Sequence, residues 1–249
     1  MPIELNGVTL PARESLVRAI DVAWERLARP GTWWSGKERI AIAAEVRGAP
    51  VCSLCRQRKA ALSPYTISGE HTSLGSLSAP AVEAVHRLTT DAERVTGTWV
   101  RGLAAPSSDG GLGEEPYAEI VSIVAIVTAL DTFDMALGLP CRPLPRPVSG
   151  APSRRRPAGA KQNLAWIATV APEDVTPGDP DPYPLHGDKN IHRALSLVPQ
   201  EVINFFDLDV ELYLKDHEIR DFANEHRAIS HAQIELIAGR TSAINRCYY

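Results

Sequence analysis

The sequence has few cysteines and no excess of positive charge. Four cysteines in 249 residues are too few for the disulfide framework of a secreted scaffold. Lysine and arginine total 26 against 30 aspartates and glutamates, so the net charge is −4 and no basic excess is available to hold a phosphate backbone. We therefore expect no nucleic acid partner.

Long apolar runs are also missing. The longest, from Ile120 to Leu130, has eleven residues, whereas a helix needs about 18 or more to cross a bilayer. The N-terminal segment MPIELNGVTLPARES has no apolar stretch between a basic start and a small-residue cleavage site, so it does not resemble a signal peptide. These absences predict a cytoplasmic protein without a membrane span.

The residues that are present give the composition of an ordinary globular protein, with 44% apolar and 22% charged residues. Apolar residues recur with helical spacing along most of the chain, and Ser35 with Glu38 has the form of a capping box. The expected helices cover residues 15–27, 36–47, 52–62, 79–89, 91–103, 115–137, 190–197, 199–208 and 219–245. The predicted fold class is all-α.

Proline-rich stretches interrupt this pattern at 140–161 and 172–184. The first has six prolines and five arginines, which predicts a solvated linker that packs little. We therefore expect three regions: a helical region over 1–139, a linker region over 140–185 and a second helical region over 186–249. Asp131 and Asp134, near the end of the apolar helix, are expected to face solvent, and the alternative is that they are buried and functional.

The two helical regions look related when their cysteines are superposed. The segment from Ile40 to Cys52 and the segment from Glu235 to Cys247 each place an apolar helix before a cysteine twelve positions on. Self-similarity of this kind predicts an internal duplication, in which the second copy is incomplete.

Cys52 and Cys55 form a C-x-x-C pair at the expected start of a helix. This spacing brings two thiols within disulfide reach, and the helix dipole and nearby cations favour the reactive thiolate. The cations are Arg47, Arg56, Arg58 and Lys59. The alternative is that both cysteines are small buried hydrophobic residues.

A zinc site is the other chemistry open to a cysteine pair. It would need four ligands, usually from a second C-x-x-C or a paired histidine motif, and the sequence offers neither close by. Five scattered histidines, His71 and His86 among them, have no spacing that distinguishes them from solvated or capping residues. We therefore expect no metal and no cofactor.

Several segments share the pattern of a known family: Trp33-Trp34, residues 38–45, the C-x-x-C run 52–64 and residues 119–133. Together they resemble the alkylhydroperoxidase D-like and carboxymuconolactone decarboxylase superfamily, in particular alkylhydroperoxidase-related proteins, some of which are selenoproteins. The resemblance spans most of the chain. It implies an alkylhydroperoxidase D-like helical fold with two related halves, and a homo-oligomer.

The resemblance also implies roles for residues of the first half. In the enzymes of this superfamily the second cysteine of C-x-x-C attacks a peroxide, the first closes a disulfide, and a glutamate and a histidine relay protons. Cys55 would be the nucleophile and Cys52 the resolving thiol, with Glu45 or Glu38 as proton donor. Glu45 approaches Cys52 only if residues 48–50 turn the chain back.

The first half departs from the superfamily pattern in its proton relay. The position twelve residues before Cys52, where the pattern has a glutamate, is Ile40, and the position four after Cys55, where it has a histidine, is Lys59.

The second half departs in the opposite sense. Glu235 stands twelve residues before Cys247, as the pattern requires, and Cys247-Tyr-Tyr249 resembles the opening of a C-x-x-C. The next position would hold the attacking residue, and we expect the codon there to be a UGA read as selenocysteine, with a natural truncation as the alternative. His231 lies one helical turn from Glu235, either as a hydrogen-bonded surface pair or as a metal or relay pair.

These observations predict thiol-dependent peroxide reduction, with a dithiol or a thioredoxin-like protein as the reductant. The alternative is a non-catalytic helical module of the same fold that serves oligomerisation or redox sensing. A decarboxylase of this fold has no need of C-x-x-C, so the cysteine pair argues against that third activity.

Overall fold

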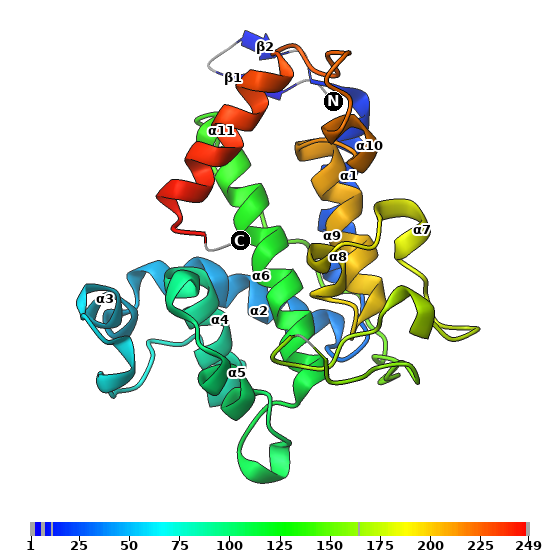
Figure 1. The fold of residues 1–249 in the computed structure, drawn as a ribbon. Coiled ribbons are helices and arrows are strands. Elements are labelled where there is room, and N and C mark those ends of the chain that lie inside the picture. The colour runs from blue at the N-terminus through cyan, green and yellow to red at the C-terminus, as the bar shows by residue number, and fades with distance from the viewer. Residues whose placement is uncertain (1–2, 6–7, 11, 164, 248–249) are drawn as a thin grey trace.

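The computed structural model describes residues 3–5, 8–10, 12–163 and 165–247, and helices dominate it (Figure 1). The prediction of an all-α class is confirmed. Within the described ranges the only strands are β1 (Ile3–Leu5) and β2 (Val8–Leu10), a short antiparallel pair with Ile3 opposite Leu10. The motif Cys247-Tyr-Tyr249 continues into positions 248–249, which lie outside the described residues.

Eleven α-helices and five short 3₁₀ turns make up the described chain. The helices are α1 (Glu14–Ala28), α2 (Gly36–Gly48), α3 (Ser53–Ala60), α4 (Ala79–Asp91), α5 (Gly97–Leu103), α6 (Glu114–Ala136), α7 (Tyr183–His186), α8 (Asn190–Arg193), α9 (Pro199–Leu212), α10 (Asp216–Ile219) and α11 (His231–Ile244). The turns are η1 (Ala49–Val51), η2 (Pro64–Thr66), η3 (Ala92–Arg94), η4 (Ser107–Asp109) and η5 (Pro172–Asp174). Among these described helices, none is both long and apolar enough to cross a membrane.

Helix α2 begins with the capping box that the sequence predicts. The Ser35 side chain accepts a hydrogen bond from the Glu38 N–H at 3.3 Å, and the Glu38 carboxylate accepts one from the Ser35 N–H at 2.8 Å. These bonds satisfy N–H groups that have no partner within the helix. At the other end of α2, η1 contains Pro50 and redirects the chain into α3, so that Cys52 becomes the N-cap residue of α3.

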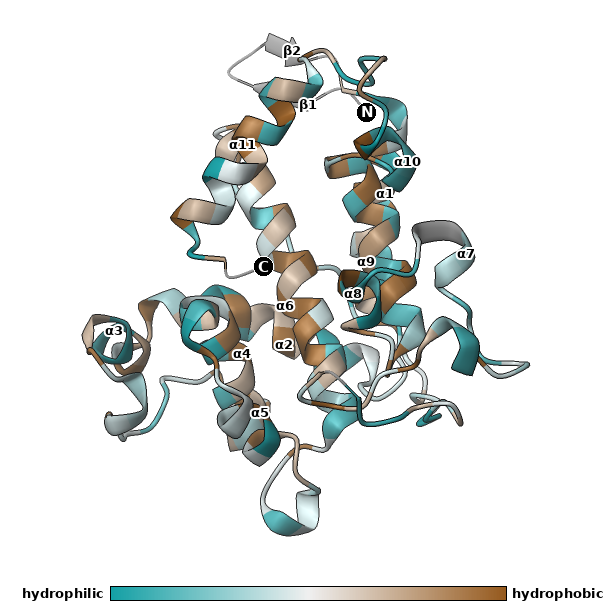
Figure 2. Ribbon diagram, in the orientation of Figure 1, coloured by the Kyte–Doolittle hydropathy of each residue, from teal (hydrophilic) through white to brown (hydrophobic). Residues whose placement is uncertain are grey.

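Helix α6 runs through the middle of the molecule and packs against α2, α4 and α9 (Figure 1). Apolar residues follow it where it passes between these neighbours (Figure 2), and Ile120 and Ile123 are fully buried. A helix that is apolar around its circumference is one that neighbours surround. Leu197 and Val198 belong to the same hydrophobic cluster, so one core extends from the first helices across the 140–185 region into residues 186–249.

A buried ion network joins three of these helices. Arg39 of α2 pairs with Glu119 of α6 and with Glu201 of α9, whose Oε1 lies 2.9 Å from Arg39 Nη1. Ser122 donates a hydrogen bond to the other Glu201 oxygen at 2.7 Å. Buried charges persist in proteins when they are paired and hydrogen-bonded in this way. The network holds α2, which also carries Glu45, in place against α6 and α9.

The proline-rich segment 140–161 has no α-helix or strand, yet it is held against the helical body. The Val148 N–H donates to the Ala28 carbonyl at 2.8 Å, and the Arg156 guanidinium pairs with Glu114 at 3.0 Å. Most of its residues are exposed, as expected of a solvated segment, but its arginines and backbone amides also hold it to α1 and α6.

The two aspartates near the end of α6 do not face solvent as expected. Asp134 is buried, and Arg142 donates to both of its carboxylate oxygens, at 3.0 and 2.7 Å. Asp131 accepts a similar pair of hydrogen bonds from Arg47, at 2.9 and 2.7 Å. The prediction failed because both arginines come from other elements of the fold.

The long helix expected over 219–245 is interrupted. Residues 220–230 form turns, in which the Asp221 carboxylate accepts a hydrogen bond from the Asn224 side chain at 2.9 Å. Ser230 then starts α11 with a capping box, because its side chain accepts from a backbone N–H three residues on. The side-chain hydrogen bonds at both places compete with a continuous helix.

Two shorter expectations are also corrected. The helix expected over 91–103 consists of η3 followed by α5, which starts anew where the Thr96 side chain caps the Trp99 N–H. The helix expected over 190–197 is limited to α8, Asn190–Arg193.

Candidate functional site

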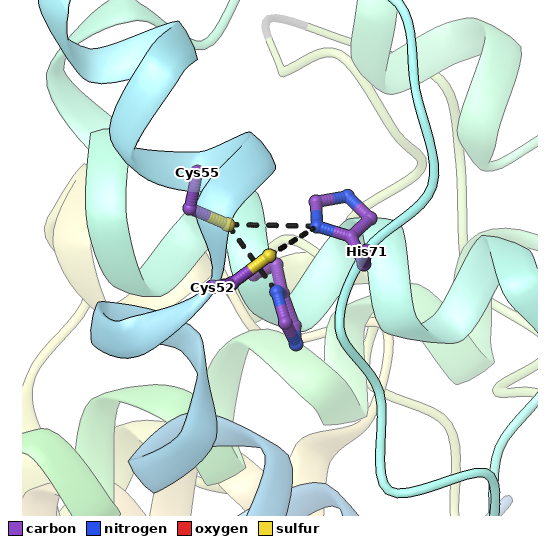
Figure 3. A group of neighbouring side chains, drawn as sticks. Cys52, Cys55 and His71 are labelled. Atoms are coloured by element: carbon purple, nitrogen blue, oxygen red, sulfur yellow. Dashed lines mark hydrogen bonds between the residues drawn. The ribbon is translucent and has the colours of Figure 1, made fainter.

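Two sulfur atoms meet where α2 turns into α3 (Figure 3). Cys52 is the N-cap residue of α3, and Cys55 lies in its first turn. Their exposed fractions are 0% and 4%. The N-terminal end of a helix favours a negative charge, so this position suits thiolates.

Two histidines from other segments complete the cluster. His71 comes from the chain between η2 and α4, and its Nδ1 lies 3.6 Å from Cys52 Sγ and 3.5 Å from Cys55 Sγ. His86 comes from α4, and its Nδ1 lies 3.2 Å from Cys55 Sγ. The donor atoms of all four side chains lie within 4.8 Å of one another. We call these four residues the Cys–His cluster.

A carboxylate holds the far side of each imidazole. His71 Nε2 lies 2.7 Å from Glu83, and His86 Nε2 lies 3.0 Å from Glu45. An imidazole that donates from Nε2 to a carboxylate leaves Nδ1 facing the sulfurs. The pairing therefore orients both rings toward the cysteines.

Both carboxylates are fixed in turn. Glu83 accepts hydrogen bonds from Arg58 at 2.7 Å and from the Trp99 indole at 3.1 Å. Glu45 is fully buried and accepts from Ser73 Oγ at 2.7 Å and from the Leu74 N–H at 2.6 Å. Hydrogen bonds from these neighbours therefore hold both carboxylates in place beside the imidazoles.

The charges of the cluster reinforce one another. Burial opposes ionisation of Cys52, but hydrogen bonds from the Cys55 backbone, His71 and the Thr72 N–H lower its pKa to about 5. Burial likewise opposes charge on His71, yet its contacts with Cys55, Glu83 and Cys52 raise its pKa to about 10. The pKa of Cys55 is also lowered, against burial, by His71 and His86. These directions describe thiolates facing imidazolium rings.

A cleft with a volume of about 720 Å³ opens beside the cluster. His71 and Glu83 form part of its wall, together with the apolar side chains of Leu77, Trp99 and Leu103. Neither cysteine lines the cleft, so the sulfurs border it through His71.

No family model, no curated protein and no solved structure matches the chain. Membership of the alkylhydroperoxidase D-like superfamily stays a prediction from the motifs.

The structure brings three of the predicted site residues together and leaves four apart. Cys52, Cys55 and Glu45 meet in the Cys–His cluster or against it, and η1 supplies the turn that Glu45 needs. Glu45 reaches His86 rather than a cysteine. Glu38 lies at the start of α2, where its carboxylate is used in the capping box.

The remaining predicted residues lie on or next to α11, which is not part of the cluster. Glu235 accepts a hydrogen bond from the Tyr213 hydroxyl, and its Oε1 lies 3.6 Å from His231 Nε2. Cys247 follows α11 and is exposed. Among the described residues, the buried His231 therefore contacts Glu235 away from the Cys–His cluster.

Sequence reasoning missed His71, His86 and Glu83. The prediction that both histidines are solvated or capping residues is wrong, since His86 is fully buried and His71 contacts both sulfurs. These two histidines place two further ligand atoms beside the sulfurs, although the sequence has no paired histidine motif near the cysteines. One signal was available, because His86 stands among the buried apolar residues of α4.

Proposed function

We propose that the protein reduces peroxides with the Cys52–Cys55 dithiol. The observation that carries this proposal is the shared contact of both sulfurs with His71 Nδ1, with a second imidazole on Cys55. A peroxide-reducing dithiol needs two sulfurs close enough to bond and a proton carrier beside the attacking one. The Cys–His cluster holds all of these groups.

Cys55 fits the attacking role, because its sulfur contacts both imidazoles whereas Cys52 contacts one. The Cys55 thiolate attacks one peroxide oxygen, the O–O bond breaks, and the departing alkoxide takes a proton from an imidazolium. Cys55 is left as a sulfenic acid. The Cys52 thiolate then attacks the Cys55 sulfur, so that a disulfide forms and water leaves with a proton from the second imidazole.

The two electrons that reduce the peroxide come from the dithiol, and a dithiol or thioredoxin-like reductant restores them by disulfide exchange. His86 with Glu45, and His71 with Glu83, provide the glutamate and histidine pairs that a proton relay requires. The apolar wall of the neighbouring cleft suits an organic hydroperoxide that approaches from the His71 side.

The test is peroxide consumption by the metal-free protein with a dithiol reductant. We expect Cys55→Ser to reduce consumption to the rate measured without protein. Cys141→Ser is the matched control, because Cys141 is an exposed cysteine outside the cluster, and it should retain the full rate. Consumption by Cys55→Ser at the wild-type rate would refute the proposal.

The second candidate function is redox sensing, and the burial of both sulfurs behind His71 favours it. A sensor is oxidised once per chain, whereas an enzyme turns over as long as reductant is present. The same assay separates the two functions: one equivalent of peroxide consumed, with a disulfide formed and no further turnover, identifies a sensor.

A further inference from the structure

We propose that Cys52, Cys55, His71 and His86 form a tetrahedral Zn²⁺ site, with Cys52 Sγ, Cys55 Sγ, His71 Nδ1 and His86 Nδ1 as the ligand atoms. This metal site goes beyond the peroxide reduction proposed above, and it requires only the geometry of the cluster.

The separations between ligand atoms fit a tetrahedron around zinc. With Zn–S of about 2.3 Å and Zn–N of about 2.0–2.1 Å, a sulfur and a nitrogen on one zinc lie about 3.6 Å apart. Three of the four sulfur–nitrogen distances in the cluster are 3.6, 3.5 and 3.2 Å, and the fourth, from Cys52 Sγ to His86 Nδ1, is within 4.8 Å. All four atoms lie within 4.8 Å of one another, which leaves room for one ion at their centre.

The orientation of the imidazoles points to a metal more than to hydrogen bonding alone. Both sulfurs converge on the single Nδ1 of His71, and one N–H donates well to only one of them. An ion at the centre bonds to all four atoms at once. Two thiolates also balance the charge of Zn²⁺, so the ion and its four ligands together are electrically neutral.

The carboxylates are placed as in established zinc sites. A zinc-bound histidine almost always donates its other ring N–H to a carboxylate, a carbonyl or water, which fixes the tautomer and strengthens the ligand. Glu83 serves His71 in this way at 2.7 Å, and Glu45 serves His86 at 3.0 Å. A set of two sulfurs and two nitrogens selects zinc over magnesium or calcium, which prefer oxygen ligands.

The local fold indicates what a closed four-ligand site would do. Residues 61–78, which carry His71, have no α-helix and only the turn η2. Beneath α3 the hydrophobic cluster is small and consists of Cys52, Leu54 and Cys55, with Ile67 packed against it. A metal that joins α3, this loop and α4 supplies the cross-link that the small apolar cluster lacks.

Bound zinc would also control the reactivity of the dithiol toward peroxide. This part of the inference, unlike the metal site itself, rests on the proposed function. Zinc bonded to both sulfurs occupies the electron pairs needed for attack on a peroxide. A peroxide that oxidises the two thiolates to a disulfide, and is itself reduced to an alcohol and water, removes two of the four ligands, so that Zn²⁺ is released.

The experiment is a Co²⁺ titration of the metal-free, reduced full chain, followed by displacement with Zn²⁺. We expect one equivalent of Co²⁺ per chain, with the strong visible bands of a tetrahedral ion and thiolate-to-metal charge transfer, and complete displacement by one equivalent of Zn²⁺. Cys141→Ser should behave as the wild type. A weak octahedral spectrum, or unchanged binding by Cys52→Ser, would overturn the proposal.

A second variant keeps the test decisive if Cys52→Ser fails to fold. Glu83→Gln retains all four ligands and replaces the carboxylate that His71 shares with Arg58 and Trp99. We expect it to weaken Zn²⁺ binding about 10–100-fold, as loss of such outer partners does; affinity equal to that of the wild type contradicts the site. Zinc binding by a protein that does not consume peroxide supports the metal site and refutes the proposed function, whereas peroxide consumption without metal binding does the reverse.

Discussion

Glu45 and Glu38 both belong to α2, but their carboxylates make different hydrogen bonds. Glu45 is fully buried and accepts hydrogen bonds from Ser73, from the Leu74 N–H and from His86. Glu38 accepts from Ser35 at the start of the helix. Substitution at the two positions therefore compares a carboxylate that supports the Cys–His cluster with one that caps a helix.

Glu45→Ala removes the acceptor of all three hydrogen bonds. A buried donor without a partner costs about 1–3 kcal/mol. The Ser73 hydroxyl can rotate to another acceptor, so the Leu74 N–H and His86 carry most of the loss. We expect the free energy of unfolding to fall by about 3–5 kcal/mol, the range for breaking a buried charged pair.

Glu45→Gln is the more specific variant, because it disrupts only the hydrogen bond with His86. The Oε1 acceptor of Ser73 and Leu74 is retained, while an NH₂ group replaces the oxygen that faces His86 Nε2. Two donors cannot pair, so the His86 imidazolium gives up its Nε2 proton and keeps the proton on Nδ1, which faces Cys55. We expect a stability loss of about 1–2 kcal/mol, together with the Nδ1–H tautomer in the ¹⁵N spectrum of His86.

The measurement is urea unfolding of the reduced, metal-free protein. Glu38→Gln is the control, since glutamine also completes a capping box, and it should lose less than about 0.5 kcal/mol. A Glu45→Ala variant as stable as Glu38→Gln, or a His86 that keeps its Nε2 proton in Glu45→Gln, would contradict this prediction.

Three further predictions concern stability and proteolysis. Burial opposes ionisation of Glu83, but His71 and Arg58 lower its pKa to about 2 from 4.5. The ionised carboxylate therefore adds about 3 kcal/mol to the free energy of unfolding above pH 4.5, and this contribution is lost as the pH falls toward 2. Urea unfolding over this range should show a flatter pH dependence for Glu83→Gln than for the wild type, and equal slopes would contradict the shift. Arg39→Met leaves two carboxylates buried without their cation and should cost about 3–5 kcal/mol in the same assay, whereas a loss below about 1 kcal/mol would show that the network is dispensable. Trypsin should cut at Arg240 before Arg156, because α11 buries only His231 of its residues while Arg156 pairs with carboxylates of α6; mass spectrometry of early fragments decides the order.

The sequence by itself determined the features that depend on neighbours along the chain. Helical spacing predicted the long helices, because the period of apolar residues reports which side of a helix is buried. Ser35 and Glu38 marked the start of α2, since a capping box closes within three residues. Cys52 and Cys55 were recognisable as a pair for the same reason: one turn of helix brings them together.

The same local rules failed where a partner comes from elsewhere. The aspartates of α6 were expected in solvent, but arginines of other elements pair with them. The segment 140–161 was expected to be loose, but its polar groups find partners on α1 and α6. The composition of a segment shows whether it has the apolar residues to form a core of its own. It carries no information about which side chains of other segments will lie beside it.

Only the tertiary structure decided what surrounds the cysteines. His71 and His86 stand 16 and 31 residues after Cys55, outside the helix that carries the cysteine pair. They meet the sulfurs because α4 packs on α3 and because the chain between these helices folds back over them. Glu45 reaches His86 because the turn η1 reverses the chain after α2, bringing the end of that helix against α4. Contacts between segments depend on the packing of the helices as bodies, and for that reason no local pattern in the sequence revealed a four-residue cluster.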